Sequence, residues 1–213
     1  MTRLIFVRHG QSAANFERVF AGHTDVPLTD LGRAQAAAAG EYLRRFRVDV
    51  AYASDLRRAY DTAAIIAAYH ALTPIPDPAF REIYAGDWEG RRFDDLMVEY
   101  PKEYATVWRT DIGRVQTPNG ESTVDLAARV SAGVERLLAK HQGKTVLIGT
   151  HATPIRMLEC LWRGLPATEA AKIAWTQNAS TTVVEYKGDR PHILLRGYDD
   201  YLGRMTTSFP SNV

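Results

Sequence analysis

The sequence predicts a three-layer α/β/α sandwich around a mostly parallel central sheet, with an antiparallel strand allowed at one edge. Short apolar segments typical of buried strands alternate along the chain with longer segments of helical periodicity. The length of 213 residues, against roughly 150 for an average domain, favours a single domain over residues 1–213. Hydrophobic residues make up 46% and charged residues 24%, which are typical globular fractions and argue against disorder.

The alternation of strands and helices begins near the N-terminus. Residues 4–7 form a short apolar run that predicts a buried strand, and polar residues follow it directly. Apolar residues at three-to-four spacing then predict an amphipathic helix over residues 31–46. Thr29 or Asp30 is the expected N-cap of this helix, because both side chains accept hydrogen bonds from free backbone N–H groups.

A second strand and a second helix follow in the same order. Residues 48–53 predict the strand, and residues 56–70 predict an alanine-rich helix. Ser54 and Asp55 between them are expected to form a capping turn. Residues 72–121, by contrast, contain five prolines and no persistent period, so we expect loops and short helices that form a cap over the site.

Regular structure returns in the last third of the chain. The predicted elements are a helix over 122–141, a strand over 145–149 and a helix over 154–162. Two strands at 180–187 and 192–197 follow, joined as a hairpin through Gly188 and Asp189. This hairpin would supply the antiparallel edge of the sheet.

Composition and charge exclude several functional classes. The 26 basic residues against 25 acidic ones give a net charge of +1, which disfavours nucleic-acid and membrane-surface binding. Cys160 is the only cysteine, so an intrachain disulfide framework and a cysteine-rich zinc site are excluded. The apolar run at 63–69 is too short to span a bilayer, and residues 4–7 are too short for a secretory signal. We therefore expect a cytoplasmic protein.

Polar residues follow three of the predicted strands at their carboxyl ends, where ligands bind in α/β sheets. Arg8 and His9 follow the first strand, an arginine pair at 57–58 comes shortly after the second, and His151 follows the strand at 145–149. If these strands are parallel neighbours, two histidines and at least two arginines meet at one rim. Guanidinium groups and helix N-termini at such a rim are suited to a phosphate or another tetrahedral anion.

A histidine beside a bound phosphoryl group has a defined chemical role. A neutral imidazole can attack phosphorus in line and form a phosphohistidine, which divides hydrolysis into two easier steps. Nearby cations lower the pKa of that imidazole and keep it unprotonated. The leaving oxygen needs a proton from a carboxyl group, for which Glu82 and Asp87 are the candidates. The arginines and the second histidine would then hold the phosphoryl oxygens.

The residues around these positions also resemble a known family. Residues 8–12, Arg-His-Gly-Gln-Ser, with Asn15 are similar to the opening motif of the histidine phosphatase superfamily, the phosphoglycerate-mutase-like proteins. The likeness continues in the expected order at Gly22, Asp25, Pro27, Leu28, Thr29, Gly32, Gln35, Ser54, Leu56, Arg58, Ala59, Thr62, Ala63, Glu82, Gly86, Trp88, Glu89, Gly90, Gly120, Glu121, Ser122, His151, Ile155, Arg156, Asn178, Ala179 and Ser180. This ordered set is far more specific than the Arg-His-Gly tripeptide alone.

The resemblance implies a role for each candidate residue. It assigns the catalytic roles to His9, Glu82 and His151, and the phosphate contacts to Arg8, Asn15 and Arg58, with His151 among them. His9 would be the nucleophile that is transiently phosphorylated, and Glu82 the proton donor that later activates water. Arg58, rather than Arg57, fits the family's Leu-x-Arg-Ala frame. No metal and no cofactor are implied.

Within the superfamily, the resemblance favours hydrolysis. Mutases typically carry a tyrosine where this chain has Ala85, and the paired arginines that grip phosphoglycerate have no clear counterpart. Residues 81–90 are more similar to the small broad-specificity phosphatases. We therefore expect hydrolysis of small-molecule phosphate monoesters, with a mutase and a non-catalytic binding protein on the same fold as open alternatives.

The expected partner is a small phosphorylated substrate, while the oligomeric state, a homodimer included, stays open. The substrate-binding candidates are Gly22, Tyr84 and Trp88, and the other aromatic candidates for a pocket wall are Phe16, Phe20 and Trp108. Core packing is an equal alternative for all the aromatic residues. Two positions depart from the family pattern: Ala152 replaces a glycine, and Asp-Asp-Tyr at 199–201 stands where a histidine is usual.

Overall fold

The computed structural model describes residues 1–105 and 116–207, and its sheet confirms the expected α/β architecture. Six strands of the described residues pair in the order β3-β2-β4-β1-β5-β6. They are β1 (Thr2–Arg8), β2 (Val50–Ala53), β3 (Ile75–Pro76), β4 (Thr145–Thr150), β5 (Thr181–Lys187) and β6 (Arg190–Tyr198). The first four run parallel, whereas β5 is antiparallel to β1 and β6 to β5. The expected hairpin therefore supplies the antiparallel edge.

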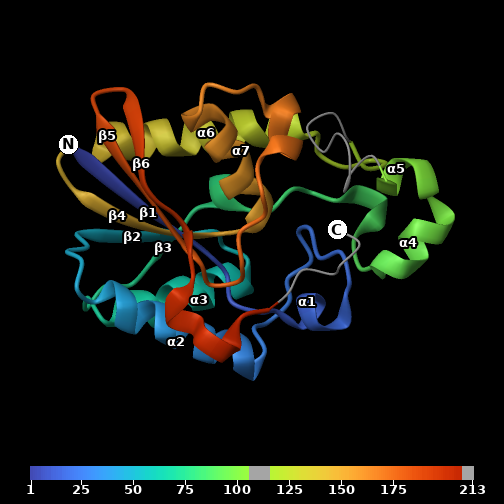
Figure 1. The fold of residues 1–213 in the computed structure, drawn as a ribbon, viewed down its shortest axis with the longest axis horizontal. Helices are drawn as coiled ribbons and strands as arrows, with labels where there is room; N and C mark the ends of the chain where they lie inside the picture. Colours follow the sequence, from blue (N-terminus) through green and yellow to red (C-terminus); the bar gives the residue numbers. More distant parts are fainter. Residues whose placement is uncertain (106–115, 208–213) are drawn as a thin grey trace.

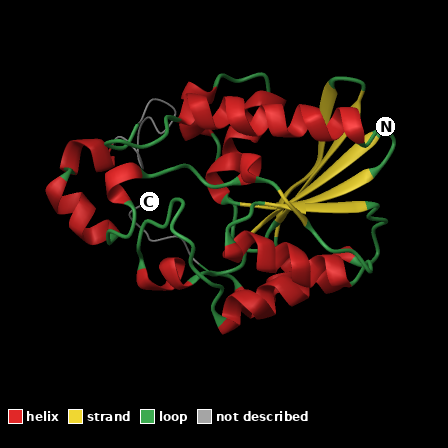
Figure 2. Ribbon diagram, turned by 180° about the vertical axis from the view of Figure 1, so that it is seen from behind, coloured by secondary structure: helices red, strands yellow, loops and turns green. Residues whose placement is uncertain are grey.

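Helices cover both faces of the sheet, as the sandwich prediction requires. In Figure 1, α2 (Asp30–Leu43) and α3 (Arg57–Ala68) lie below the sheet, and α6 (Thr123–Lys140) and α7 (Ala152–Trp162) lie above it. Figure 2 shows the same layers from behind, with the strands twisted into a fan between the helices. The shorter elements are α1 (Ala13–Glu17), α4 (Phe93–Glu99), α5 (Pro101–Ala105) and the 3-10 helices Pro78–Phe80, Gly86–Trp88, Ala167–Lys172 and Asp200–Met205.

The central strand β1 explains why both faces are covered. Leu4 and Phe6 belong to the apolar cluster that includes residues of α6 and α7, whereas Ile5 and Val7 belong to the cluster that includes residues of α2 and α3. Alternate side chains of a strand point to opposite faces, and all four of these side chains are 0% exposed. A strand buried on both faces has an uninterrupted apolar sequence, which is the pattern that predicted it.

One predicted helix start is confirmed and another is wrong. Thr29 is the N-cap of α2, and its Oγ1 accepts the backbone N–H of Gly32 at 3.0 Å. Leu56 occupies the N-cap position of α3, which has no side-chain cap, so the capping turn predicted at Ser54 and Asp55 is wrong. The hydroxyl of Ser54 accepts the N–H of Leu56 at 3.3 Å and also lies against a histidine of the site described below.

Residues 72–105 and 116–121 form loops and short helices, as predicted, except for the two-residue strand β3. In Figure 1, α4 and α5 lie at the end of the molecule away from the sheet. Trp88 and Leu96 from this segment share a small apolar cluster with Phe20. Trp108 lies outside the described residues, and the covering of the site by this segment stays a prediction.

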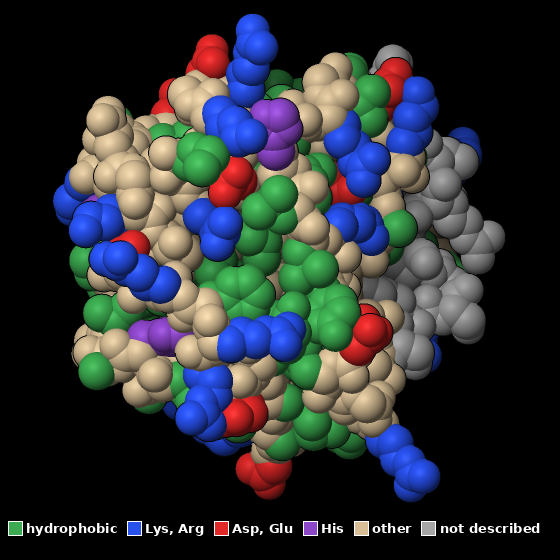
Figure 3. Space-filling view, turned by 60° about the vertical axis from the view of Figure 1, so that its left-hand side comes forward, with side chains coloured by type: hydrophobic (Ala, Val, Ile, Leu, Met, Phe, Trp, Pro, Cys, Tyr) green, Lys and Arg blue, Asp and Glu red, His purple; other side chains and the backbone are tan. Residues whose placement is uncertain are grey.

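The described residues contain no helix that is both long and apolar enough to cross a membrane. On the face shown in Figure 3, Lys and Arg side chains are scattered among acidic and apolar ones and form no continuous stripe. Some of the surface arginines pair locally, such as Arg44 with Glu41 at 2.9 Å, and exposed pairs of this kind contribute little stability.

Gly32→Ala is expected to destabilise the fold, although alanine is the better helix former by about 1 kcal/mol. A Cβ atom at Gly32 would lie 2.0 Å from the carbonyl oxygen of Gln11, and one at Gly10 would lie 2.3 Å from the carbonyl oxygen of Gly32. The turn after β1 therefore rests directly on the backbone of α2. We expect urea unfolding to show a loss of roughly 1–3 kcal/mol.

The matched control for this substitution is Ala34→Gly at an exposed position of the same helix. This control should lose only about 1 kcal/mol, because helix propensity alone changes there. A Gly32→Ala variant at least as stable as the wild type would contradict the close approach.

Candidate active site

A cavity opens at the carboxyl ends of β1 and β4, the edge where the sequence placed its polar residues. Arg8 of β1 pairs with Thr150 of β4, so the residues that follow the two strands are neighbours. The charged and polar lining includes Arg8, His9, Asn15, Arg58, Glu82 and Asn178, and the apolar lining includes Val19, Phe20, Ile83, Phe93 and Trp175. The predicted convergence of strand ends is therefore present.

A hydrogen bond fixes which ring nitrogen of His9 carries the proton. The side chain is 4% exposed, and Nδ1 lies 2.7 Å from the carbonyl oxygen of Gly10. Because a carbonyl oxygen only accepts, Nδ1 is the donor, and Nε2 of the neutral ring keeps its lone pair. The carbonyl of His9 accepts the N–H of Ala179 at 3.1 Å and Nδ2 of Asn178 at 3.0 Å. Both the ring and its backbone are thus held in place.

His151 packs edge-on against His9, with ring centroids 5.1 Å apart and ring planes at 64°. The ring is 0% exposed, and its Nε2 lies 2.9 Å from Oγ of Ser54. Oγ of Ser54 accepts the N–H of Leu56 at 3.3 Å, which favours donation of its own proton to Nε2. The ring proton then resides on Nδ1, which is buried and has no hydrogen-bond partner among the described residues. Such a donor is suited to an anionic oxygen, and His151 lies behind His9 rather than among the residues that line the cavity.

Both histidines are neutral at physiological pH. Burial lowers the pKa of His9 well below the usual 6.5, and the charges of Arg58 and Arg8 lower it further. Burial also lowers the pKa of His151 well below 6.5, with Arg58 and then His9 adding to the effect. The lone pair that a nucleophile requires is therefore present on His9 without a separate base.

Two buried guanidinium groups accompany the histidines. Arg58 is 1% exposed and donates to the carbonyl oxygens of Gly22 at 2.7 Å and Thr24 at 3.0 Å. Arg8 is 5% exposed and donates to the carbonyl oxygen of Thr176. Burial lowers the pKa of each arginine to about 10, so both stay charged at neutral pH. Two buried cations beside one cavity favour a bound anion.

Glu82 supplies the carboxylate of the cavity. Oε2 accepts the N–H of Thr153, in the first turn of α7, at 3.4 Å, and Oε1 accepts the N–H of Ile83 at 2.8 Å. Its charge raises the pKa of Arg8 and Arg58 against the stronger effect of burial. A carboxyl group beside two cations and a helix N-terminus is placed to exchange a proton with a molecule bound between them.

Asn15 lines the cavity and is part of the cap of α1. Its N–H donates to Oγ of Ser12 at 3.2 Å, and its Oδ1 accepts the N–H of Ser12 at 3.1 Å. Oδ1 also accepts Nδ2 of Asn178 at 3.2 Å. Because the oxygen is engaged in these bonds, the amide nitrogen is the group left to bind an anion.

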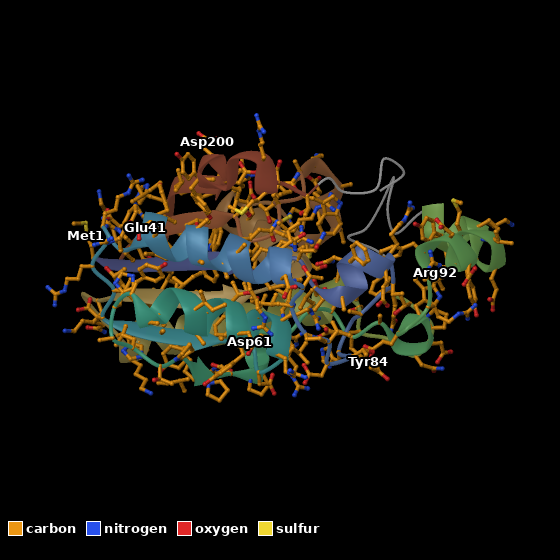
Figure 4. The ribbon with its side chains drawn as sticks, turned by 90° about the horizontal axis from the view of Figure 1, so that it is seen from below. Met1, Glu41, Asp61, Tyr84, Arg92 and Asp200 are labelled. Carbon is orange, nitrogen blue, oxygen red and sulfur yellow. The ribbon has the colours of Figure 1, made fainter. Side chains whose placement is uncertain are left out.

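The three substrate-binding candidates have different positions. Gly22 lines the cavity, with φ at +50°. Trp88 is 0% exposed and packs against Phe20 with ring centroids 6.2 Å apart, so its prediction as a substrate contact is wrong. Tyr84 is 42% exposed, packs beside His23 at 5.3 Å and lies at the outer edge of the molecule in Figure 4. It is absent from the cavity lining, and its role as a substrate contact stays a prediction.

The aromatic wall of the cavity comes from other residues. Phe20 lines the cavity as expected, but Phe16 is 73% exposed and lies outside the lining. Phe93 and Trp175 line the cavity and were missed by sequence reasoning. The guanidinium of Arg156 lies 4.1 Å from the ring centroid of Trp175 and supports it from the protein side. The one sequence signal for Trp175 is its closeness to the Asn-Ala-Ser motif at 178–180.

The two departures from the family pattern are accommodated. Ala152 begins α7 and does not have a positive φ, so the absence of a glycine causes no backbone strain. Tyr201 donates from its hydroxyl to the carbonyl oxygen of Ala179, and that hydroxyl lies 2.8 Å from Oγ1 of Thr181. Because Ala179 in turn holds the carbonyl of His9, Tyr201 supports the site from behind.

Comparison with protein families decides the assignment. The family model of the histidine phosphatase superfamily, branch 1, matches residues 4–199. The chain belongs to this superfamily. The family suggested by the sequence motifs is thereby confirmed. In the residues that the structure describes, His, Cys, Asp and Glu side chains form no cluster of three suited to a metal ion.

Relatives of this chain include both reaction types. Phosphoserine phosphatase 1 of Hydrogenobacter thermophilus is 30% identical over 203 residues, which is 95% of each chain. A 2,3-bisphosphoglycerate-dependent phosphoglycerate mutase of Bartonella bacilliformis is 34% identical over 199 residues, covering 86% of this chain and 96% of the mutase. A bifunctional protein of Mycobacterium tuberculosis is 37% identical over 158 residues. That match covers 74% of this chain and 43% of the relative, so the chain spans less than half of that protein.

Solved structures with the same fold include phosphatases. A mycobacterial glucosyl-3-phosphoglycerate phosphatase in complex with VO3 is 32% identical with a TM-score of 0.84, covering 90% of this chain and 96% of the other. A putative alpha-ribazole-5'-P phosphatase of Escherichia coli is 27% identical with a TM-score of 0.78, covering 90% and 94%. YhfR of Bacillus stearothermophilus is 29% identical with a TM-score of 0.88, covering 92% and 97%.

The two buried histidines are expected to make the fold less stable in mild acid. Because their pKa values are lowered in the folded state, the unfolded chain binds protons that the folded chain does not. The stability contributed by the neutral rings is complete above about pH 6.5 and is lost as the pH falls towards the lower folded pKa. We expect His151→Gln to lose less stability than the wild type between about pH 7.5 and about pH 5 in urea unfolding.

His192→Gln, at an exposed position of β6, is the control for this measurement and should keep the wild-type dependence on pH. An unchanged dependence in His151→Gln would show that His151 is not buried as a neutral ring.

Proposed function

We propose that the protein is a metal-independent phosphatase that hydrolyses small-molecule phosphate monoesters through a phosphohistidine on His9. The observation that carries this proposal is the state of His9: its Nδ1 is occupied by the carbonyl of Gly10, and its neutral ring lines a cavity together with two buried arginines. Nε2 is thereby the nucleophile, and Arg8 and Arg58 provide the binding site for the phosphoryl oxygens.

In the first step, Nε2 of His9 attacks phosphorus in line with the ester oxygen. The N–P bond forms as the P–O bond to the alcohol breaks, and the carboxyl group of Glu82 donates its proton to the departing oxygen. Arg8, Arg58 and Nδ1–H of His151 stabilise the charge that develops on the other oxygens. The amide of Asn15 is a further donor.

In the second step, water attacks the phosphohistidine from the side that the alcohol has left. The carboxylate of Glu82, now without its proton, accepts a proton from that water. The N–P bond breaks, inorganic phosphate departs, and Nε2 of His9 regains its lone pair. The enzyme returns to its starting state with Glu82 protonated, so no other group has to store a proton.

The alcohol portion of the substrate would contact the apolar side of the cavity, formed by Val19, Phe20, Ile83, Phe93 and Trp175. A small substrate with an apolar or ring-bearing part fits such a wall. The phosphatases among the relatives and solved structures support hydrolysis of monoesters as the reaction class.

A mutase is the second candidate, because the Bartonella bacilliformis relative is 34% identical. In a mutase, the phosphoryl group returns from the histidine to a substrate oxygen, and a bisphosphate primer is needed. Ala85 stands where mutases typically carry a tyrosine, and it is 0% exposed and outside the cavity lining. This chain therefore lacks a group there that could position phosphoglycerate, which favours hydrolysis.

His9→Ala is expected to abolish phosphate release from a panel of monoesters in the presence of excess chelator, because the nucleophile is removed. The panel includes 3-phosphoglycerate, aryl phosphates and alkyl phosphates, and released phosphate is measured directly. Arg57→Ala is the control, because Arg57 is exposed and lies outside the cavity lining, and it should keep most of the activity. Equal losses in the two variants, or activity that survives without His9, would refute the proposal.

Glu82→Gln is expected to slow hydrolysis according to the leaving group. A primary alkyl phosphate needs a proton on its departing oxygen, so its kcat/KM should fall by about 100-fold or more. An aryl phosphate such as p-nitrophenyl phosphate leaves as a stable anion, so its kcat/KM should fall by much less. Steady-state kinetics with both esters measures the ratio, and an equal loss for both would exclude Glu82 as the proton donor.

A further inference from the structure

The guanidinium of Arg129, on α6, holds the chain segment that carries Glu82. Nη1 donates to the carbonyl oxygens of Pro78 at 3.3 Å, Ala79 at 3.0 Å and Arg81 at 3.1 Å. Nη2 donates to the carbonyl oxygen of Glu82 at 3.2 Å. One side chain thus binds four of the five carbonyls from Pro78 to Glu82, on the segment that leads to the proton donor, through the planar set of donors that a guanidinium provides.

The guanidinium is itself fixed by a carboxylate. Nε of Arg129 donates to Oε1 of Glu121 at 2.8 Å, and Nη2 donates to Oε2 at 2.7 Å, a bidentate pair. The pair is largely shielded, with side-chain exposures of 25% and 15%. Glu121 also binds the chain beyond Glu82, because its N–H donates to the carbonyl of Tyr84 at 2.8 Å and its Oε2 accepts the N–H of Tyr84 at 3.2 Å.

A second side chain, that of His23, also donates a hydrogen bond to the carbonyl of Glu82. Nε2 of His23 lies 2.9 Å from the carbonyl oxygen of Glu82, so Nε2 carries the ring proton. His23 stands between Gly22 and Thr24, the two residues whose carbonyls bind Arg58. The carbonyl of Glu82 is therefore joined both to α6 and to the loop that holds an arginine of the cavity.

The carboxyl group of Glu82 has weaker support of its own. It accepts one hydrogen bond from the N–H of Ile83, the next residue, and one at 3.4 Å from the N–H of Thr153. The N–H of Ile83 moves together with Glu82, and the hydrogen bond from Thr153 is long. The position of the carboxyl group in the cavity is therefore set mainly through the backbone at residue 82.

We infer that Arg129 and His23 are positioning residues for the proton donor: by binding the backbone carbonyl of Glu82 from two sides, they set the distance between its carboxyl group and the departing oxygen. This inference rests on the proposed function, in which Glu82 protonates that oxygen. Neither residue lines the cavity, and the donors of both are occupied by Glu121 and by backbone carbonyls. Their loss should impair proton transfer and leave binding of the phosphoryl group and attack by His9 almost unchanged.

The test compares kcat/KM for a primary alkyl phosphate with kcat/KM for p-nitrophenyl phosphate in each variant. Arg129→Ala should lower the value for the alkyl ester by about tenfold or more, because a small displacement of a catalytic group is costly. It should lower the value for the aryl ester by about threefold at most. The ratio of the two values does not depend on how much of the enzyme is folded, so partial unfolding cannot imitate the result.

Two further variants separate positioning from a general structural role. His23→Ala should shift the ratio in the same direction, because it removes the second donor to the carbonyl of Glu82. Arg136→Ala is the matched control: Arg136 is also on α6 and pairs with Asp77, just before the segment held by Arg129. It should leave the ratio at the wild-type value.

The combination with Glu82→Gln is decisive. If Arg129 acts through Glu82, then Arg129→Ala should not change the ratio further once Glu82 is glutamine. An Arg129→Ala variant that slows both esters equally, or one that shifts the ratio again in the Glu82→Gln background, would overturn the inference. These outcomes differ from failure of the proposed function, in which the wild type would hydrolyse neither ester or Glu82→Gln would slow both equally.

Discussion

The burial of two arginines beside two histidines is the constraint on which the rest of the site depends. A guanidinium removed from water is costly unless it is hydrogen-bonded, and here backbone carbonyls accept hydrogen bonds from both arginines. The same charges and the same burial keep the rings of His9 and His151 neutral. One arrangement therefore provides both an unprotonated nucleophile and a site with excess positive charge. A phosphoryl group bound there would balance that charge.

The fold brings these groups together from distant parts of the chain. The parallel pairing of β1 with β4 places the residues after both strands side by side, and β2 on the other side of β4 delivers Ser54 to His151. The turn after β1 comes so close to α2 that only glycine fits at positions 10 and 32. Glu82 lies outside the regular helices and strands, so none of them fixes its position directly. The segment that carries Glu82 depends on side chains, above all Arg129, for its shape.

Much of the fold and the centre of the site could be predicted from the sequence, because the relevant signals are local. The apolar run of β1 reflects burial on both faces, and the polar residues directly after it are positioned by the strand itself. The errors concern non-local packing. The sequence around Trp88 does not reveal whether its ring faces a cavity or a core, and the structure places it in the core. Trp175 and the Ser54–His151 bond depend on contacts between segments far apart in the chain, for which no pattern of spacing exists.

The central claim is that the phosphoryl group is transferred to His9 before it is transferred to water. The stereochemical course at phosphorus tests this claim most directly. A phosphorothioate monoester made chiral at phosphorus with two oxygen isotopes would be hydrolysed in water enriched in the third, and the configuration of the released thiophosphate would be determined. Each in-line displacement inverts the configuration, so attack by His9 followed by attack by water predicts overall retention. Overall inversion would mean that water attacks the substrate in a single step, and it would contradict the account.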